Sequence, residues 1–282
     1  MVKTAFSTAI FLVGVLIGPL TAGTIATPQF YSLKDKSLVS PAAMAETLAA
    51  HRIVLVGESH TAVSHHQGQL SVIQLLNEKK VPVAIGMEMM RRDSQPYLDA
   101  WIDGALSEDE FQAIYLDNWN YPWSLYRPIF VYAREHKIPI VGLNVSRGIT
   151  RQVAREGFDS LSDTQREGLP FVTCSVDDDY MKFIRQAYGA HAHGQMQFDH
   201  FCEAQLVWDK AMAANALRYV EQAPERVMVI LAGSGHARQG GIPTQLDTLG
   251  QISYQVILPE IPSVLDTQTI DSGDADFLLQ GL

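Results

Sequence analysis

The sequence predicts an α/β protein with a mainly parallel sheet flanked by helices and a smaller helical subdomain. Two observations support this class: the candidate strands are continuous apolar runs, and segments with helical character separate them. Continuous apolar strands are typical of sheets covered on both faces, and alternation of strands with helices is typical of parallel sheets. With 282 residues, of which 47% are hydrophobic and 18% charged, the chain can bury a large core.

The expected elements follow in order after an extended lead-in at 27–39. Ser40 followed by a proline is typical of a helix start and predicts a helix to about 50. The predicted strands are 53–56, 83–88, 138–143, 227–232 and 252–258, and the other predicted helices are 64–78, 94–114, 122–136, 147–156, 162–168, 176–188 and 198–221. About 80 residues separate the third strand from the fourth, more than one crossover helix needs. We therefore expect a helical subdomain at about 147–221 within one α/β domain, 27–282.

The segment 1–26 has the pattern of a signal peptide. Lys3 precedes the uncharged stretch 5–20, and small residues follow it. An uncleaved membrane anchor is the alternative, although two glycines and a proline within the stretch weaken a long anchoring helix. No cysteine lies nearby to accept a lipid. We expect a periplasmic or secreted protein that is not a lipoprotein.

Charge and cysteine content restrict the function further. A net charge of -10 and the lack of a basic run exclude a non-specific nucleic-acid binder. The two cysteines, Cys174 and Cys202, are too few for a thiolate metal cage. In an oxidising compartment we expect them to form a disulfide, with two buried thiols as the alternative.

Polar side chains follow the first four predicted strands at their carboxyl ends, where open parallel sheets bind ligands. The first and fourth strands lead into two Gly-x-x-His turns, 57–60 and 233–236, and the third strand ends at Asn144. Carboxylates and imidazoles on one rim suit a divalent metal or acid–base catalysis. The catalytic candidates are Glu58, His60, Glu88 and His236, and the metal candidates are Glu58, His60 and His236.

Further polar residues lie beside these turns. His65 and His66 begin the next helix, although histidines at a helix start are more often solvated. The segment 188–200 contains three histidines and two glycines, which suits either a flexible connection or a lid that supplies ligands to a metal or metalloporphyrin. Gln205 and Asp209 lie one helical turn apart, and they point either at the rim or into solvent.

Taken in order, these motifs resemble the ChaN family of haem-binding iron-uptake proteins. They are VLVGESH at 54–60, HHxxQ at 65–69, GME at 86–88, PIVGLN at 139–144, AQxxWDxxMA at 204–213, and GSGHAR at 233–238 with GIP at 241–243. The resemblance implies haem at a dimer interface, with a tyrosine as axial ligand and a histidine near the propionates. The wider superfamily includes Tiki proteases, TraB proteins and erythromycin esterases. It implies an active site at the two histidine turns, with a metal in the Tiki branch.

We therefore expect an extracytoplasmic haem-binding protein of haem or iron uptake rather than an enzyme. The alternative is a metal-dependent or acid–base hydrolase that uses the two turns. Tyrosinate suits ferric haem iron, so the haem candidates are the tyrosines and histidines around the histidine-rich segment: Tyr180, Tyr188, His191 and His193, with Tyr121 and Tyr126 as alternatives. The expected partners are haem, an outer-membrane haem receptor, and a second copy of the chain when haem is bound.

Overall fold

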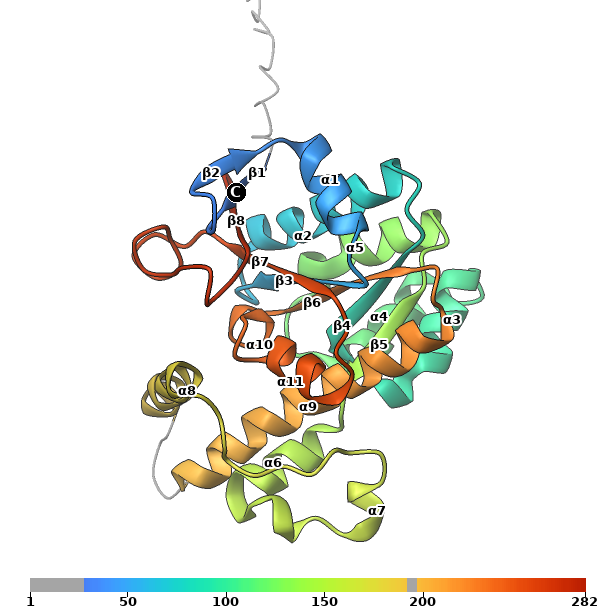
Figure 1. Ribbon diagram of the computed structural model, residues 1–282. Helices are drawn as coiled ribbons and strands as arrows, with labels where there is room; N and C mark the ends of the chain where they lie inside the picture. Colours follow the sequence, from blue (N-terminus) through green and yellow to red (C-terminus); the bar gives the residue numbers. More distant parts are fainter. Residues whose placement is uncertain (1–27, 192–196) are drawn as a thin grey trace, which may run out of the picture.

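In the computed structural model, which describes residues 28–191 and 197–282, a sheet of eight strands crosses the protein in the order β2-β1-β8-β7-β3-β6-β4-β5 (Figure 1). The strands are β1 (Gln29–Ser32), β2 (Ser37–Val39), β3 (Ile53–Glu58), β4 (Val83–Arg91), β5 (Ile140–Asn144), β6 (Val227–Gly233), β7 (Tyr254–Pro259) and β8 (Phe277–Gln280). From β8 to β5 all neighbours are parallel, whereas β1 is antiparallel to both β8 and β2. The predicted fold class, α/β with a mainly parallel sheet, is confirmed.

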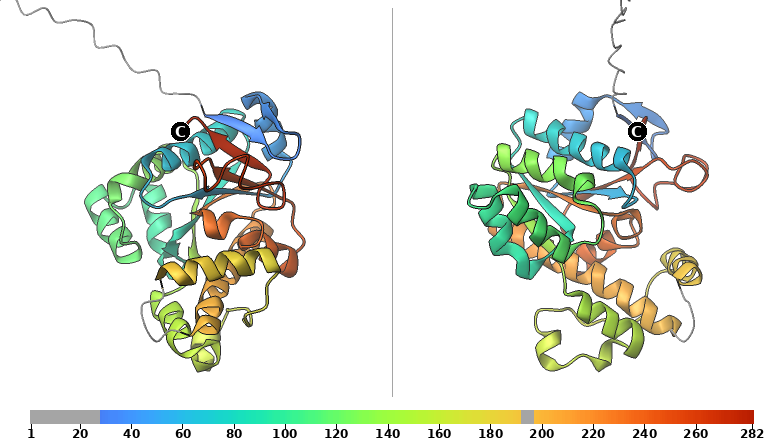
Figure 2. Two further views of the ribbon diagram at one scale, coloured as in Figure 1. Left: turned by 90° about the vertical axis from the view of Figure 1, so that its left-hand side faces the viewer. Right: turned by 180° about the vertical axis from the view of Figure 1, so that it is seen from behind.

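Helices cover both faces of this sheet (Figures 1 and 2). They are α1 (Pro41–Ala49), α2 (Val63–Glu78), α3 (Gln95–Asp103), α4 (Glu108–Asn118), α5 (Trp123–Glu135), α6 (Arg147–Glu156), α7 (Asp163–Arg166), α8 (Asp178–His191), α9 (Phe198–Gln222), α10 (Ser234–Ala237) and α11 (Ile242–Leu249). In β3, Val54 and Val56 join the hydrophobic cluster of α1–α5, and Ile53 and Leu55 join that of α9 and α11. Burial of both faces explains why the strand is continuously apolar.

A third hydrophobic cluster holds α6, α8 and the first half of α9 together beyond one end of the sheet (Figure 2). We call residues 147–209 the helical cap. Phe201 and Leu206 of α9 belong to the cluster of the cap, whereas Met212 and Ala216 of the same helix belong to the core against the sheet. Because α9 is one helix of 25 residues, it connects the cap rigidly to the sheet.

The structure differs from the sequence prediction mainly at element ends. The predicted helix 94–114 is two helices, because Gly104 ends α3 in the left-handed region with φ +86°. The expected capping box at Ser107 then starts α4. The third strand begins at Ile140 rather than at 138, and the short strands β1, β2 and β8 were not predicted. They pair with one another at one side of the sheet, a long-range contact that no local pattern reveals.

No helix within 28–191 or 197–282 is long and apolar enough to cross a membrane. The predicted signal peptide, 1–26, lies outside the described residues.

Cys174 and Cys202 form the expected disulfide. It joins the irregular segment before α8 to the buried face of α9, within the hydrophobic cluster of the cap. It thereby closes a loop that contains the whole of α8.

We predict that the double change Cys174→Ser and Cys202→Ser lowers the free energy of unfolding by about 3 kcal/mol, because the open chain has more conformations when unfolded. Urea unfolding of both proteins, with and without a reducing agent, measures this difference. The reductant should destabilise the wild type and leave the double variant unchanged. Equal stabilities without the reductant would contradict the prediction.

Candidate functional site

The carboxyl ends of β3, β4, β5 and β6 border a cavity of about 850 Å³ beneath the helical cap. Its lining combines polar residues of the strand ends with aromatic side chains and three arginines. The polar group includes Glu58, His60, Glu88, Asn144 and His236, the aromatic group is Trp119, Tyr121, Phe183, Phe201 and Trp208, and the cations are Arg91, Arg147 and Arg238. The cavity lies where open parallel sheets bind their ligands.

Glu58, the last residue of β3, is the centre of the first polar cluster. Its side chain is buried, with 2% of the residue exposed. Oε1 accepts hydrogen bonds from His60 Nδ1 at 2.6 Å and from the Tyr126 hydroxyl at 2.7 Å. Oε2 contacts Nε2 of His66, which extends from the first turn of α2. The first cluster thus unites β3, α2 and α5 around one carboxylate.

Within the first cluster, Glu58 and His60 stabilise each other's charged forms. Burial opposes ionisation of Glu58, but hydrogen bonds from His60 and His66, and their charges, outweigh it and lower its pKa to about 2. Burial likewise opposes protonation of His60, yet its hydrogen bond to Glu58 and the charges of Glu88 and Glu58 raise its pKa. The contact with Glu58 therefore favours the protonated form of His60, and the contact with His60 favours the ionised form of Glu58.

Asp209, in the middle of α9, is the centre of the second polar cluster and is completely buried. Oδ1 accepts a hydrogen bond from His236 Nδ1 at 2.7 Å, and Oδ2 accepts one from the Tyr180 hydroxyl at 2.6 Å. Burial opposes protonation of His236, but the charges of Asp209 and Glu88 and the hydrogen bond to Asp209 raise its pKa to about 9. Burial beside Asp209 raises the pKa of Tyr180 well above its ordinary value, so this tyrosine remains a neutral donor.

The two clusters meet at Gly233, the last residue of β6. Its backbone N–H donates to Glu88 Oε2 at 2.7 Å, and Glu88 Oε1 lies 3.9 Å from His236 Nε2. Gly233 pairs in register with Glu58 of β3. A Cβ atom at this position would lie 3.0 Å from Cε1 of His60 and 3.6 Å from Oε2 of Glu88. Glycine is therefore needed here for both clusters to approach each other.

The four predicted catalytic residues thus lie together at one rim. The predicted metal residues Glu58, His60 and His236 do not form a metal centre. Within 28–191 and 197–282, no group of three or more His, Cys, Asp or Glu residues is arranged to hold a metal ion. The expectation of a metal at this rim is therefore not supported.

Two other sequence expectations are resolved at the rim. His65 and His66 are buried rather than solvated, and His65 Nδ1 accepts the backbone N–H of Ser59 at 2.9 Å. Of the polar pair on α9, Asp209 points inward to its buried partners, and Gln205 lines the cavity. His65, His66 and Asp209 thus contact residues of the two histidine turns, and Gln205 borders the cavity above them.

The haem candidates lie on and after α8, which packs against the turn that follows β6. Tyr180 is buried with its hydroxyl on Asp209. Tyr188 is partly buried and contacts the rings of Phe198 and Phe201 edge-on, each at 5.5 Å between centroids. The last residue of α8 is His191, and His193 lies outside the described residues.

Sequence reasoning missed the aromatic wall beside His60. The centroids of the Trp119 and Tyr121 rings lie 5.0 and 5.1 Å from that of His60. The signal that could have revealed this wall is the run of three aromatic residues within 119–123, directly after a helix. Sequence reasoning also missed that Tyr126 donates a hydrogen bond to Glu58.

The raised pKa of His236 predicts a loss of stability in alkali. Its pKa rises from 6.5 to about 9 on folding, so its contribution is complete below about pH 6.5 and is lost as the pH rises through 9. Relative to His236→Gln, the wild type should lose up to about 3 kcal/mol of unfolding free energy over this interval. Urea unfolding at a series of pH values measures it. The exposed His136 provides the control. The unfolding free energy of His136→Gln should change with pH as that of the wild type does. If the unfolding free energy of His236→Gln changed with pH in the same way, His236 would not be the group responsible.

Comparison with solved structures finds the same fold in other proteins. The chain is similar to the structure that describes cofacial haem binding to ChaN of Campylobacter jejuni, with 19% identity, a TM-score of 0.71, and coverage of 89% of this chain and 96% of that chain. It is also similar to the type III effector HopBA1, with 10% identity, a TM-score of 0.50, and coverage of 91% and 97%. At these identities the similarity shows the fold alone. No curated protein matches the sequence.

Membership of a family rests on the sequence itself. The family model described as haem-binding uptake, Tiki superfamily, ChaN, matches residues 44–246. The match includes both Gly-x-x-His turns, the whole cap, and the residues of both polar clusters. It confirms the resemblance that the ordered motifs indicated. The chain therefore belongs to the ChaN family of haem-binding uptake proteins in the Tiki superfamily.

Proposed function

We propose that this protein binds haem in the cavity beneath the cap and acts outside the cytoplasm in haem or iron uptake. The cavity is the observation that supports the proposal. Its volume of about 850 Å³ is within the range of roughly 300–1,000 Å³ found for small-molecule and cofactor pockets. Its aromatic walls suit the apolar porphyrin plane, and its arginines suit the propionates. Membership of a haem-binding family supports the same ligand.

A tyrosine is the iron ligand that we propose, because a phenolate oxygen is a known axial ligand of haem iron. Tyr180 is poorly placed for this role, since its hydroxyl is buried and donates to Asp209. Tyr188 is more accessible and lies beside Phe201, which lines the cavity. Tyr121 lies in the cavity wall itself. His191 and His193 follow Tyr188 closely in sequence, and we propose them as further haem contacts.

We also propose that haem joins two copies of the chain. The solved structure of ChaN from Campylobacter jejuni is described by its cofacial haem binding, and this chain shares that fold. The signal-peptide pattern at 1–26 and the disulfide between Cys174 and Cys202 support an oxidising compartment. An outer-membrane haem receptor is the proposed donor.

We predict that titration of the purified mature protein with hemin gives a Soret band that saturates at a fixed stoichiometry. Tyr121→Phe and Tyr188→Phe each remove one hydroxyl and keep the ring. The variant that lacks the axial ligand should lose the tyrosinate charge-transfer band and bind hemin at least about tenfold more weakly, because a phenyl ring cannot donate to iron. Light scattering on the same samples should show the mass doubling at saturation.

Tyr180→Phe is the matched control. It should keep the spectrum of bound haem and lose about 1–3 kcal/mol of unfolding free energy, because Asp209 loses a buried donor. An unchanged charge-transfer band in all three variants would rule out Tyr121, Tyr180 and Tyr188 as the ligand, and the absence of this band from the haem-bound wild type would refute a tyrosine ligand. If the wild type gives no Soret band, the haem function itself fails.

Acid–base hydrolysis is the second candidate function, because two imidazoles, each bonded to a buried carboxylate, line the cavity. Their protonation states oppose it. A general base works best with a pKa near the working pH, but the pKa of His236 is about 9 and that of Glu58 is about 2. At neutral pH His236 therefore carries a proton, and Glu58 has none to donate.

We predict that the wild type hydrolyses p-nitrophenyl acetate at neutral pH no faster than His236→Ala does. The His60→Ala variant should also match both rates, since His60 is engaged with Glu58. The measurement is the release of p-nitrophenolate, compared with a protein-free blank. A wild-type rate above the blank that falls about 10²- to 10⁴-fold in both variants would establish the hydrolase instead.

A further inference from the structure

We propose that Arg147, at the start of α6, binds a carboxylate of the ligand in the cavity. This subsite rests on the proposed haem function and assigns one propionate to the end of the cavity that Arg147 borders. The ligand class is a planar apolar molecule with a carboxylate at its edge.

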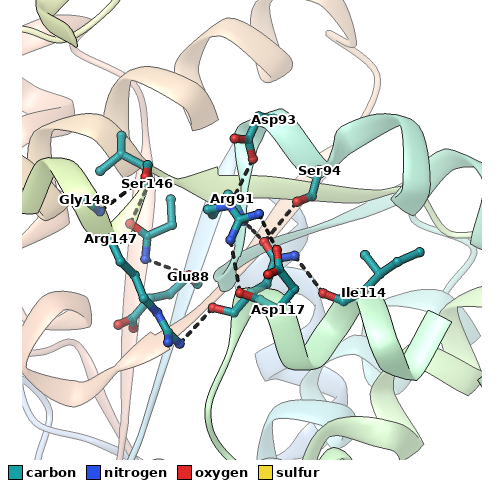
Figure 3. Close-up of polar contacts among 12 residues, drawn as sticks. Glu88, Arg91, Asp93, Ser94, Ile114, Asp117, Ser146, Arg147 and Gly148 are labelled. Atoms are coloured by element: carbon teal, nitrogen blue, oxygen red, sulfur yellow. Dashed lines mark hydrogen bonds and ion pairs between the residues drawn. The ribbon is translucent and has the colours of Figure 1, made fainter. Parts of the chain in front are cut away.

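Two of the three arginines that line the cavity are already neutralised. Arg91 donates to Asp93 Oδ1 at 3.1 Å and to Asp117 Oδ2 at 2.8 Å, contacts that Figure 3 draws as dashed lines. Arg238 forms an ion pair with Asp274. These two guanidinium groups are each matched by carboxylates of the protein and have less to offer a ligand.

Arg147 has neutral partners instead. Nη1 donates to Asn120 Oδ1 at 2.7 Å, and Nη2 donates to the Asn118 carbonyl oxygen at 2.9 Å. Within the described ranges no ion pair joins Arg147 to a carboxylate. The two hydrogen bonds use two of the five N–H groups of a guanidinium. Asn118 is itself buried and bonded to Ser94, so the arginine is held in place with donors to spare.

The surroundings of Arg147 carry excess positive charge. It is the first residue of α6, where the helix dipole favours an anion, and the first turn of α6 contains no acidic residue. Arg151 follows one turn later. Burial, and then the charges of Arg151 and Arg91, lower the pKa of Arg147, and Asp117 offsets this only in part. An anionic group of the ligand would relieve this repulsion.

The aromatic wall defines the rest of the ligand. The guanidinium carbon of Arg147 lies 5.9 Å from the centroid of the Trp119 ring. Trp119 in turn packs against Tyr121, at 5.6 Å between centroids, and both flank His60. A flat apolar molecule against this wall would therefore bring a carboxylate at its edge to Arg147. Porphyrins with free propionates have this shape and charge.

The experiment compares metal-free protoporphyrin IX with its dimethyl ester, by fluorescence titration of wild type and variants. The free acid lacks iron, so an axial ligand contributes nothing to its affinity, and the ester lacks the carboxylates. Arg147→Gln should bind the free acid about 10- to 100-fold more weakly than the wild type, as expected for loss of a charge-assisted hydrogen bond. It should bind the ester with wild-type affinity. Arg147→Lys should recover part of the lost affinity, because lysine restores the positive charge but lacks the paired N–H donors of the planar guanidinium.

The matched control is Arg151→Ala, which removes the same charge from the same helix at an exposed residue outside the cavity lining. Its affinity for the free acid should stay within about twofold of wild type, because exposed charges are screened. Equal losses for acid and ester in Arg147→Gln would show that Arg147 only supports the wall, and no loss for either would remove it from the site. Both results overturn the proposal.

A second probe separates this proposal from the haem function. 8-Anilinonaphthalene-1-sulfonate is an aromatic anion without a porphyrin ring. If the wild type binds neither porphyrin but binds this dye, and Arg147→Gln weakens the dye, the anion subsite stands while the haem function fails. If the wild type binds neither porphyrin, and the dye binds equally to wild type and Arg147→Gln or does not bind at all, the subsite fails together with the haem function.

Discussion

The buried carboxylate of Asp209 is the constraint on which the arrangement of cap and sheet depends. An ionised carboxylate without water costs several kcal/mol unless donors surround it. Its donors are the Tyr180 hydroxyl from α8 and the His236 imidazole from the turn after β6. Since Asp209 lies on α9, the contacts join three segments that are distant in the sequence. Together with the continuous helix α9, this cluster links the cap to the strand ends that border the cavity.

Glu58 has the equivalent role on the other side of the rim, where it gathers His60, His66 and Tyr126. The two clusters approach from opposite sides because parallel strands bring their carboxyl ends to one edge of the sheet. Gly233 lies between them, and its lack of a side chain leaves room for both clusters. The Gly-x-x-His turns are therefore parts of a paired scaffold, in which each imidazole stabilises a buried carboxylate.

This internal pairing explains how residues typical of hydrolases can line a cavity for which we propose haem binding. A histidine whose Nδ1 is bound to a carboxylate and whose pKa is raised to about 9 serves to balance charge rather than to accept a proton. The floor of the cavity is then largely neutralised by its own contacts. What remains for a ligand is the aromatic wall of Trp119 and Tyr121 and the cation of Arg147.

The sequence by itself determined the parallel sheet, both histidine turns, the helices of the cap and the cysteine pair. These follow from local patterns: continuous apolar strands, glycine beside histidine at strand ends, and only two cysteines. Only the tertiary structure decided that His66 and Tyr180 turn inward, that Asp209 is the partner of His236, and that β1 pairs with β8. The reason is physical: side-chain direction and strand pairing depend on packing between distant segments, which no local pattern encodes.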